Sequence, residues 1–377
     1  MLSARQLNRA TLERQMLLRR QRVGVVDTVR RIVALQAQSA ASPYLALWNR
    51  IAGFDPAELD AAYAVRAVVK ATLMRVTLHV VDADDYPEFH NAMQSRLRAA
   101  RLADPRSITS GGRVIPIDQL LPPLAQFAAV PRTDAELADR LAELLGERNR
   151  LVWRALRTIA PLHHVPTGGP WSFGSAPSFV AARSKHGAGA PQESVRRLLL
   201  RYLHGFGPAT AQDCAQFTFL LLPDVLGGLR SSPGEVYELP GPDGETFYDV
   251  AGAPLPDGNI PAPPRLLPMW DSILLAYAKR TRVVPAQYRP VVFRRNGDVL
   301  PTLLVDGYVA GVWRVVDAGV EATAFHPLDE AQWEGLATEA AALLDLLRER
   351  ERTVYRRYDH WWDKGLPAAD VRVLPVP

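Results

Sequence analysis

Apolar residues recur at helical spacing in the first part of the chain. Val26, Val29 and Ile32 lie on one side of a helix predicted for residues 26–35, which follows an earlier helix over residues 3–20. The Ser-Pro pair that comes next is expected to begin another helix, because proline is favoured in the first turn.

Strand-forming residues follow these helices. Residues 68–72 and 77–81 are rich in valine and threonine, which favour extended backbone. Closely spaced helices followed by a strand pair are typical of a winged helix. Two later parts of the chain are expected to repeat the plan, with helices near 117–127, 134–145, 151–158 and 191–206, a further helix from Thr210, a hairpin over 162–173, and strands at 236–239 and 246–250.

The pattern changes after a proline-rich stretch at residues 254–268. Alternating apolar residues surround two Xaa-Gly turns, Asn296-Gly297 and Asp306-Gly307, which are typical of β-hairpins. This part is predicted to form a small antiparallel barrel or sheet, followed by one amphipathic helix over about 329–350 and an aromatic tail.

Composition changes the picture in two respects. Lysine occurs at only four positions, so almost all positive charge in this chain of net charge +4 is arginine. Arginine suits phosphate recognition, but a GC-rich genome would produce the same bias. No run of 18 apolar residues is present and the N-terminus carries early charges, so we expect no membrane span, no signal peptide and a cytoplasmic protein.

Cofactor and metal motifs are absent from the sequence. Cys214, the single cysteine, excludes a cysteine-based metal site and is expected to be a buried helix residue. His163 and His164 are adjacent, and on a strand they would point to opposite faces, so no metal site is predicted there. We therefore expect no cofactor.

Several stretches, taken in order, resemble the AlkZ/YcaQ-like winged-helix DNA glycosylases. They are Leu35-Gln-Ala-Gln-Ser39, Tyr44–Trp48, Leu73–Tyr86, Tyr202–Thr210, Leu267–Ser272 and Val299–Trp313. The resemblance implies an α+β fold of three tandem winged-helix units with a C-terminal antiparallel β-barrel, C-shaped around DNA. The corresponding boundaries are 1–115, 116–188, 189–260 and 261–377.

The resemblance also implies an activity and a site. The function expected is hydrolysis of the N-glycosidic bond of N7-alkylated purines in double-stranded DNA, including interstrand crosslinks, by a monomeric, monofunctional glycosylase. Gln36 and Gln38 are the implied catalytic residues. Their Gln-x-Gln form resembles the branch of the family linked to azinomycin self-resistance, whereas the broader crosslink glycosylases carry Gln-x-Asp.

Two glutamines suffice only for a substrate that is already labile. An N7-alkylated purine is cationic and leaves as a neutral base, so no general acid is needed. Gln36 and Gln38 would then position a water and stabilise the cationic sugar through their dipoles. Residues i and i+2 share a side in extended backbone but not in a helix, so both amides can face one nucleotide only if the helix ends near Leu35 or Gln36.

The sequence also offers candidate DNA contacts. Arg294, Arg295 and Asn296 form an arginine-rich turn suited to a groove or to phosphates, although a solvated turn is the alternative. A second set, expected to alternate along one strand and line the same cleft, consists of Arg75, Thr77 and His79.

Two other functions fit parts of the pattern. A winged-helix transcription regulator without catalytic activity explains the helices and arginines but not the Gln-Ala-Gln motif. A protein that sequesters the alkylating drug would bind it without DNA. Lyase activity is not expected, because none of the four lysines is near Gln36 or Gln38 in sequence.

Overall fold

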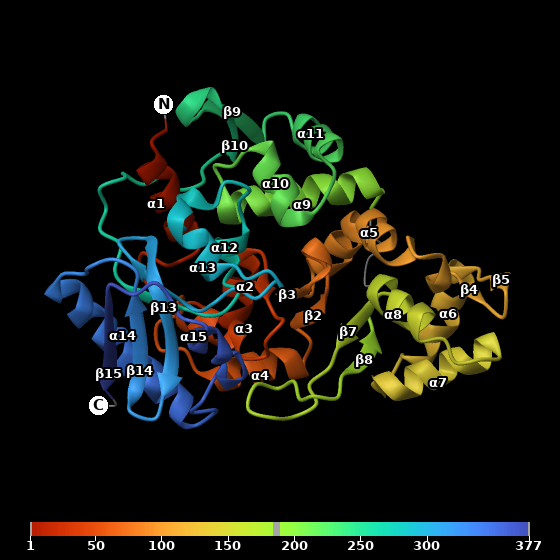
Figure 1. Cartoon of the computed structure of the whole chain (residues 1–377). Helices are drawn as coiled ribbons and strands as arrows, with labels where there is room; N and C mark the ends of the chain where they lie inside the picture. Colours follow the sequence, from red (N-terminus) through yellow and green to blue (C-terminus); the bar gives the residue numbers. More distant parts are fainter. Residues whose placement is uncertain (1, 184–188, 376–377) are drawn as a thin grey trace.

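The computed structural model describes residues 2–183 and 189–375 (Figure 1). Its α-helices are α1 (Ala4–Arg14), α2 (Val25–Ile32), α3 (Ser42–Trp48), α4 (Pro56–Ala64), α5 (Tyr86–Leu102), α6 (Ile117–Phe127), α7 (Asp134–Leu145), α8 (Arg150–Ile159), α9 (Pro191–Phe206), α10 (Ala211–Thr218), α11 (Leu222–Arg230), α12 (Ser272–Leu275), α13 (Arg289–Val292), α14 (Glu330–Arg348) and α15 (His360–Asp363). Its strands are β1 (Leu35–Gln36), β2 (Val68–Thr72), β3 (Leu78–Asp82), β4 (Thr109–Ser110), β5 (Arg113–Val114), β6 (Arg132–Thr133), β7 (Leu162–His164), β8 (Ser178–Ala181), β9 (Val236–Pro240), β10 (Thr246–Val250), β11 (Arg265–Leu267), β12 (Thr302–Val305), β13 (Tyr308–Val316), β14 (Gly319–Ala324) and β15 (Asp370–Pro375).

Two similar runs of elements build the first sheet. The order helix, strand, helix, helix, strand, strand occurs once as α2-β1-α3-α4-β2-β3 and again as α6-β6-α7-α8-β7-β8. Each run contributes three strands to one six-stranded sheet of order β1-β3-β2-β7-β8-β6. The runs meet where Lys70 on β2 pairs antiparallel with His164 on β7. The predicted strands at 68–72 and 77–81 are thus part of a larger sheet than their local sequence indicates.

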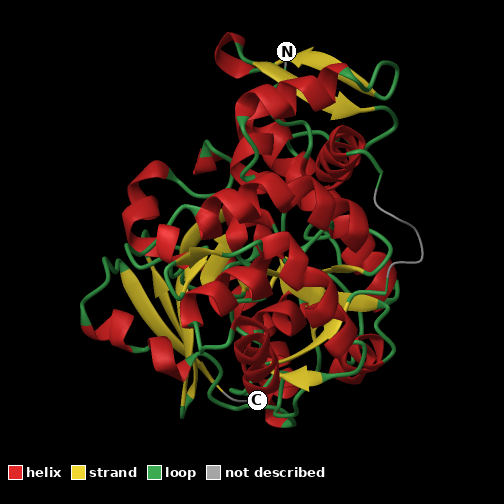
Figure 2. Ribbon diagram, turned by 90° about the vertical axis from the view of Figure 1, so that its right-hand side faces the viewer, coloured by secondary structure: helices red, strands yellow, loops and turns green. Residues whose placement is uncertain are grey.

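The third run has a separate two-stranded sheet. Thr210 caps α10 through its side chain, as predicted, and β9 pairs antiparallel with β10. Figure 2 shows this strand pair at one end of the molecule beside the N-terminus, where the Leu2 backbone N–H donates to the Pro240 carbonyl. Helix α1 packs against α9, so the first helix of the chain belongs spatially to this third run.

The C-terminal strands form an open sheet, which corrects the predicted barrel. Among the described residues, five strands pair in the order β11-β12-β13-β14-β15, and no pairing joins β11 to β15. The Asp306-Gly307 turn joins β12 to β13, and both residues have positive φ, as expected for this hairpin turn. Helix α14 contacts β11, β14 and β15. The sheet therefore buries apolar surface against a helix, so it need not close on itself.

The other predicted hairpin is also different. Residues before Asn296-Gly297 form the short helix α13, with Pro290 in its first turn, and the isolated bridge Phe293↔Val299 replaces a strand ladder across the turn. Proline in a helix start explains the change, because its fixed φ suits that position and it cannot donate to a strand ladder. The turn itself remains, with Gly297 at φ 92°.

No helix among the described residues combines the length and the apolar character needed to cross a membrane. One continuous apolar core links the parts of the chain, and the buried Cys214 belongs to it, as expected from its helical context.

Candidate active site

The backbone around the Gln-Ala-Gln motif leaves the helix early. Helix α2 ends at Ile32, and Val33 has a φ of 74°, which no helix continues. Leu35 and Gln36 then pair with β3 as the short strand β1, with Gln36 opposite His79. The helix predicted to reach residue 35 is therefore three residues shorter at this end, and the motif has the non-helical backbone that a shared role of the two glutamines requires.

The two glutamine side chains nevertheless lie in different surroundings. Gln36 is buried, with 4% of its surface exposed, whereas Gln38 follows the strand and is exposed. The Gln36 Oε1 accepts a hydrogen bond from the Gln38 backbone N–H at 2.9 Å. The Gln38 Oε1 in turn accepts from the Leu78 backbone N–H at 3.1 Å. Gln36 thus shapes the bend that presents Gln38, and Gln38 retains a second oxygen lone pair and an amide group for other partners.

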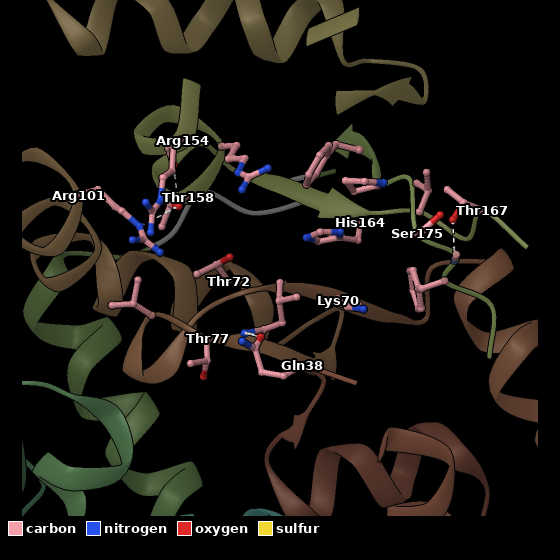
Figure 3. Close-up of a pocket in the computed structure, with 18 residues that line it drawn as sticks. Gln38, Lys70, Thr72, Thr77, Arg101, Arg154, Thr158, His164, Thr167 and Ser175 are labelled. Carbon is pink, nitrogen blue, oxygen red and sulfur yellow. Dashed lines mark hydrogen bonds between the residues drawn. The ribbon is translucent and has the colours of Figure 1, made fainter. Parts of the chain in front are cut away.

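A pocket of about 400 Å³ opens beside Gln38, where the two halves of the six-stranded sheet meet (Figure 3). Lys70 and Thr72 come from β2, Thr77 from the residue before β3, and His164 from β7. Figure 3 shows Arg101, Arg154 and Thr158 together at one end, and Thr167 and Ser175 at the other. The pocket therefore collects residues from both runs of elements.

Positive charge dominates the lining of this pocket. Its cationic side chains are Lys70, Arg101, Arg154 and Arg157, and none of the described residues that line it is Asp or Glu. Burial lowers the pKa of His164 to about 3, with Lys70 and Arg157 adding to the effect, so this ring is neutral. The pocket is suited to an anionic partner and contains no carboxylic acid for proton transfer.

A second hollow of about 540 Å³ adjoins the first, also bordered by Gln38 and Lys70. Its other side is the segment after α14, which includes Arg356 and Arg357. Tyr355 anchors this segment, because its hydroxyl lies 2.8 Å from the Ser42 hydroxyl at the start of α3. The aromatic tail of the chain thus reaches the candidate site, which its sequence position does not indicate.

Glu351 is the carboxylate that borders the second hollow. Its Oε2 accepts a hydrogen bond from the Trp171 Nε1 at 2.5 Å. The structure therefore gives this carboxylate a structural partner in the loop between β7 and β8.

The expected alternation of Arg75, Thr77 and His79 on one strand is wrong. Strand β3 begins only at Leu78, because Arg75 and Val76 adopt left-handed backbone angles in a 3-10 turn over Met74–Val76. Of the three predicted residues, only Thr77 lines the pocket beside Gln38.

Arg75 and His79 form an internal network instead. The Arg75 Nη1 donates to the Phe217 carbonyl at 2.8 Å, and its Nη2 lies 3.2 Å from the His79 Nε2. His79 is fully buried, and burial, together with Arg75, lowers its pKa to about 3. With its Nδ1 3.0 Å from the Thr77 carbonyl, the neutral ring donates through Nδ1 and accepts through Nε2. His79 therefore supports the strand opposite Gln36.

The predicted arginine-rich turn does not line either of the two hollows beside Gln38. Arg294 is half-buried and its guanidinium lies 4.8 Å from the centre of the Trp361 ring, while Arg295 and Asn296 are exposed. The Asn296 Nδ2 donates to the Asp298 carboxylate at 2.9 Å. Arg294 and Asn296 thus have partners within the protein, and contact of Arg294, Arg295 and Asn296 with DNA stays a prediction.

Sequence reasoning missed Lys70. It is 34 residues from Gln36 in sequence, yet it borders both hollows beside Gln38. Only the pairing of β2 with β3 and β7 brings it there, so no local signal could have identified it. Asp271 pairs with Arg50, and Arg314 pairs with Glu321.

His163 and His164 do diverge on β7 as predicted. The His163 ring packs edge-on against Tyr86 at 4.2 Å, while His164 contacts Phe179 and lines the pocket. In the described part of the chain, no group of three or more His, Cys, Asp or Glu side chains could hold a metal ion.

A cationic pocket at the junction of two helix-and-strand runs indicates a protein that handles a polyanion. The family described as DNA glycosylase AlkZ-like matches residues 29–346. The chain therefore belongs to the AlkZ-like DNA glycosylase family, which confirms the resemblance seen in the sequence and makes it a DNA glycosylase.

Two further comparisons agree. The chain is 26% identical, over 359 residues, to an interstrand DNA cross-link repair glycosylase of Streptomyces sahachiroi, covering 90% of this chain and 95% of that relative. The solved structure of the DNA glycosylase AlkZ of Streptomyces sahachiroi has a similar fold, with a TM-score of 0.78 at 22% identity, covering 92% of this chain and 96% of that one. Catalysis by the family excludes the regulator and the drug-sequestering protein as the primary function.

Proposed function

We propose that this chain hydrolyses the N-glycosidic bond of N7-alkylated purines in double-stranded DNA and unhooks interstrand crosslinks of this type. The first support is the similarity to a relative named as an interstrand cross-link repair glycosylase. Azinomycin-type self-resistance is the biological role proposed for it, as the Gln36-Ala37-Gln38 motif indicates by resemblance.

The observation that carries the proposal is the absence of carboxylates from the pocket beside Gln38, among the described residues. A normal base departs as an anion unless a general acid protonates it, and no carboxylic acid lines this pocket to do so. An N7-alkylated purine carries its own positive charge and departs neutral. The lack of a carboxylic acid in the described lining therefore fits a base that departs without being protonated and fits an unmodified base poorly.

The two glutamines would then have different tasks. Gln38 is the proposed catalytic residue: its free lone pair accepts from the attacking water, and its dipole stabilises the cationic sugar. Gln36 is a positioning residue in this proposal, since its Oε1 holds the Gln38 backbone N–H. We propose that the enzyme is monofunctional, which agrees with the family match, and that it needs no cofactor. The argument from sequence against a lyase does not hold in the structure, because Lys70 borders both hollows beside Gln38.

The order of the elements supports winged-helix units in the first two domains. Within the six-stranded sheet the halves run β1-β3-β2 and β6-β8-β7, which is the same order in both runs. Helices α9, α10 and α11 with the β9–β10 pair supply the third candidate unit. We propose these as units 1–115, 116–188 and 189–260, before the C-terminal sheet domain 261–377, in a monomeric, cytoplasmic protein that curves around double-stranded DNA.

Excision from defined duplexes tests the proposal. One duplex contains a single N7-methylguanine and a second contains a nitrogen-mustard N7-guanine crosslink, and alkali converts the abasic sites to strand breaks. Single-turnover rates are compared for wild type, Gln38→Ala, Gln36→Ala and the control Gln126→Ala, an exposed glutamine on α6.

We expect Gln38→Ala to lower the excision rate by about 100-fold, the typical effect of removing one positioned polar group. Gln36→Ala should lower it by about 10-fold, because the bend at Gln38 loses one hydrogen bond of about 1.4 kcal/mol. The control should match wild type. Excision from neither duplex by wild type would refute the function, and full activity of Gln38→Ala would refute the site.

A further inference from the structure

The pocket beside Gln38 contains a buried cation that no anion of the described residues neutralises. Lys70 is only 6% exposed, and its Nζ lies 4.2 Å from the centre of the Phe173 ring. Its desolvated ammonium group has no ion pair with a carboxylate among the described residues. A buried, unpaired charge is costly, so such a lysine is complementary to an anion that arrives from outside.

The groups facing Lys70 from neighbouring elements do not supply that anion. The neutral His164 lies opposite Lys70 on β7. Helix α5 contributes Arg101 to the pocket lining, and α8 contributes Arg154 and Arg157. The segment after α14 adds Arg356 and Arg357, while its Glu351 accepts from Trp171 and forms no ion pair with Lys70. Gln38 contributes an uncharged amide.

The rim of the pocket repeats this excess of positive charge. Arg101 donates from Nε to the Thr158 hydroxyl at 3.2 Å, and burial together with Arg154 and Arg157 lowers its pKa. Arg157 pairs with Asp134 at 3.0 Å, but in the described part of the chain no carboxylate pairs with Arg101 or Arg154. Of the three guanidinium groups, Arg157 therefore has a carboxylate partner, and two have none among the described residues.

We propose that this pocket is a phosphodiester-binding site for the lesion-bearing DNA strand, with Lys70 as its buried ligand and Arg101, Arg154 and Arg157 as its rim. This inference rests on the proposed function, because it assigns the DNA backbone next to the nucleotide at Gln38. The position of Lys70 beside Gln38 places a phosphate of the target nucleotide at the deep end. The rim arginines then bind the adjoining phosphate.

The site has a thermodynamic signature that an ordinary surface lysine lacks. Burial lowers the pKa of Lys70 to about 8 in the free protein. A phosphate at the Nζ favours the charged form and raises this pKa, so DNA binding takes up a proton near pH 8. Affinity therefore falls as the pH rises from 7 to 9, whereas arginines and exposed lysines stay charged throughout this range.

Binding to an uncleavable duplex measures this proton uptake. The duplex contains a tetrahydrofuran abasic analogue, and its Kd is determined at pH 7 and pH 9 for wild type, Lys70→Met and Lys279→Met. Lys279 is the matched control, since it is exposed and pairs with Glu245 outside the two hollows beside Gln38. We expect wild type and Lys279→Met to weaken by about 10-fold between the two pH values. Lys70→Met should bind about 10-fold more weakly at pH 7 and change little with pH.

The rim is tested by the dependence of Kd on salt at pH 7. Removing one phosphate contact lowers the slope of log K against log salt by about 0.9. We expect that change for Arg154→Gln and none for the control Arg348→Gln. Arg348 is on α14, pairs with Asp345 and does not line the pocket. Arg154 is exposed on α8, so its replacement leaves the core intact.

The outcomes separate this inference from the proposed function. Wild-type pH dependence in Lys70→Met, or an unchanged salt slope in Arg154→Gln, would refute the phosphate site even if excision is fully active. Loss of base excision by the wild-type protein on the lesion duplexes would refute the function even if the pH and salt effects appear. If Lys70→Met does not fold, the test is made with Lys70→Arg. The arginine stays charged between pH 7 and pH 9, so the pH dependence of Kd should disappear.

Discussion

The two large sheets of this molecule treat charged side chains in opposite ways. On the strands of the C-terminal sheet, arginines are paired with carboxylates: Arg265 with Glu339 of α14, and Arg314 with Glu321 on the neighbouring strand. In the six-stranded sheet, Lys70 lies buried at the junction of the two halves without a carboxylate partner in the described structure.

The paired charges and the unpaired lysine therefore have different roles, the first in stability and the second in binding. A charge that is paired inside the fold contributes to one defined structure, whereas an unpaired cation raises the energy of the free protein and favours the binding of an anion. The C-terminal sheet is therefore best understood as a support, and the junction of the first sheet as the place where DNA is handled.

The largest effect is expected where a buried ion pair is broken. Arg50 and Asp271 are both fully buried and joined by two hydrogen bonds, at 2.8 and 2.9 Å. Arg50→Met leaves the Asp271 carboxylate buried without its partner. We expect the free energy of unfolding to fall by about 3–5 kcal/mol, measured by urea denaturation. A loss below about 1 kcal/mol would show that buried pairing is not what distinguishes the structural charges.

Local chemistry explains which parts of the fold could be predicted. The Asp306-Gly307 turn, the cap at Thr210 and the strand at 68–72 depend on neighbouring residues, and the structure has all three. The barrel was wrong because alternating residues indicate a sheet but not how its edges are covered. Here the cover is α14, whose contact with β11 spans a long sequence separation.

The candidate site was predictable to a smaller extent. The Gln-Ala-Gln motif has its extended backbone at Gln36 because β1 pairs with β3, and the motif itself was visible in the sequence. Lys70 was not, because it joins the site through a pairing with His164 that lies 94 residues away. The prediction that Arg75 lies on a strand was wrong for a related reason. Arg75 and Val76 have positive φ, and they interrupt a run whose composition favours a strand.

The dependence of the free energy of unfolding on acid pH should also differ between the two sheets. Burial lowers the pKa of His79 and of His163 to about 3, whereas the unfolded chain titrates near 6.5. Below pH 6.5 the unfolded state therefore binds protons that the folded state does not, and stability falls as the pH falls toward 3. His163→Leu should reduce the loss between pH 7.5 and 5.5 by about 1.4 kcal/mol.

Urea denaturation at the two pH values measures this loss, and any pH-independent packing cost of the substitution cancels in the difference. His360→Leu, at an exposed position on α15, serves as the control and should keep the wild-type dependence. An unchanged pH dependence in His163→Leu would mean that the ring is accessible to protons in the folded state.

A smaller effect on stability is expected at Lys70, in contrast to Arg50. Lys70→Met removes a buried charge that has no carboxylate partner, and methionine fills a similar volume beside Phe173. We expect the free energy of unfolding to stay within about 1 kcal/mol of wild type or to rise. A loss of about 3 kcal/mol or more, as for a broken buried pair, would show that Lys70 has an internal structural role.

The smallest effect should come from a paired charge on the C-terminal sheet. Arg314 and Glu321 lie directly opposite on β13 and β14, and two hydrogen bonds of 2.9 Å join them while both side chains remain partly exposed. Cross-strand pairs of this kind contribute about 0.2–1 kcal/mol, so Arg314→Gln should lower stability by no more than that. Because this guanidinium already has its anion, the salt dependence of DNA binding should match wild type. A lower salt slope would place DNA on the C-terminal sheet as well, and would remove the division between a supporting sheet and a binding sheet.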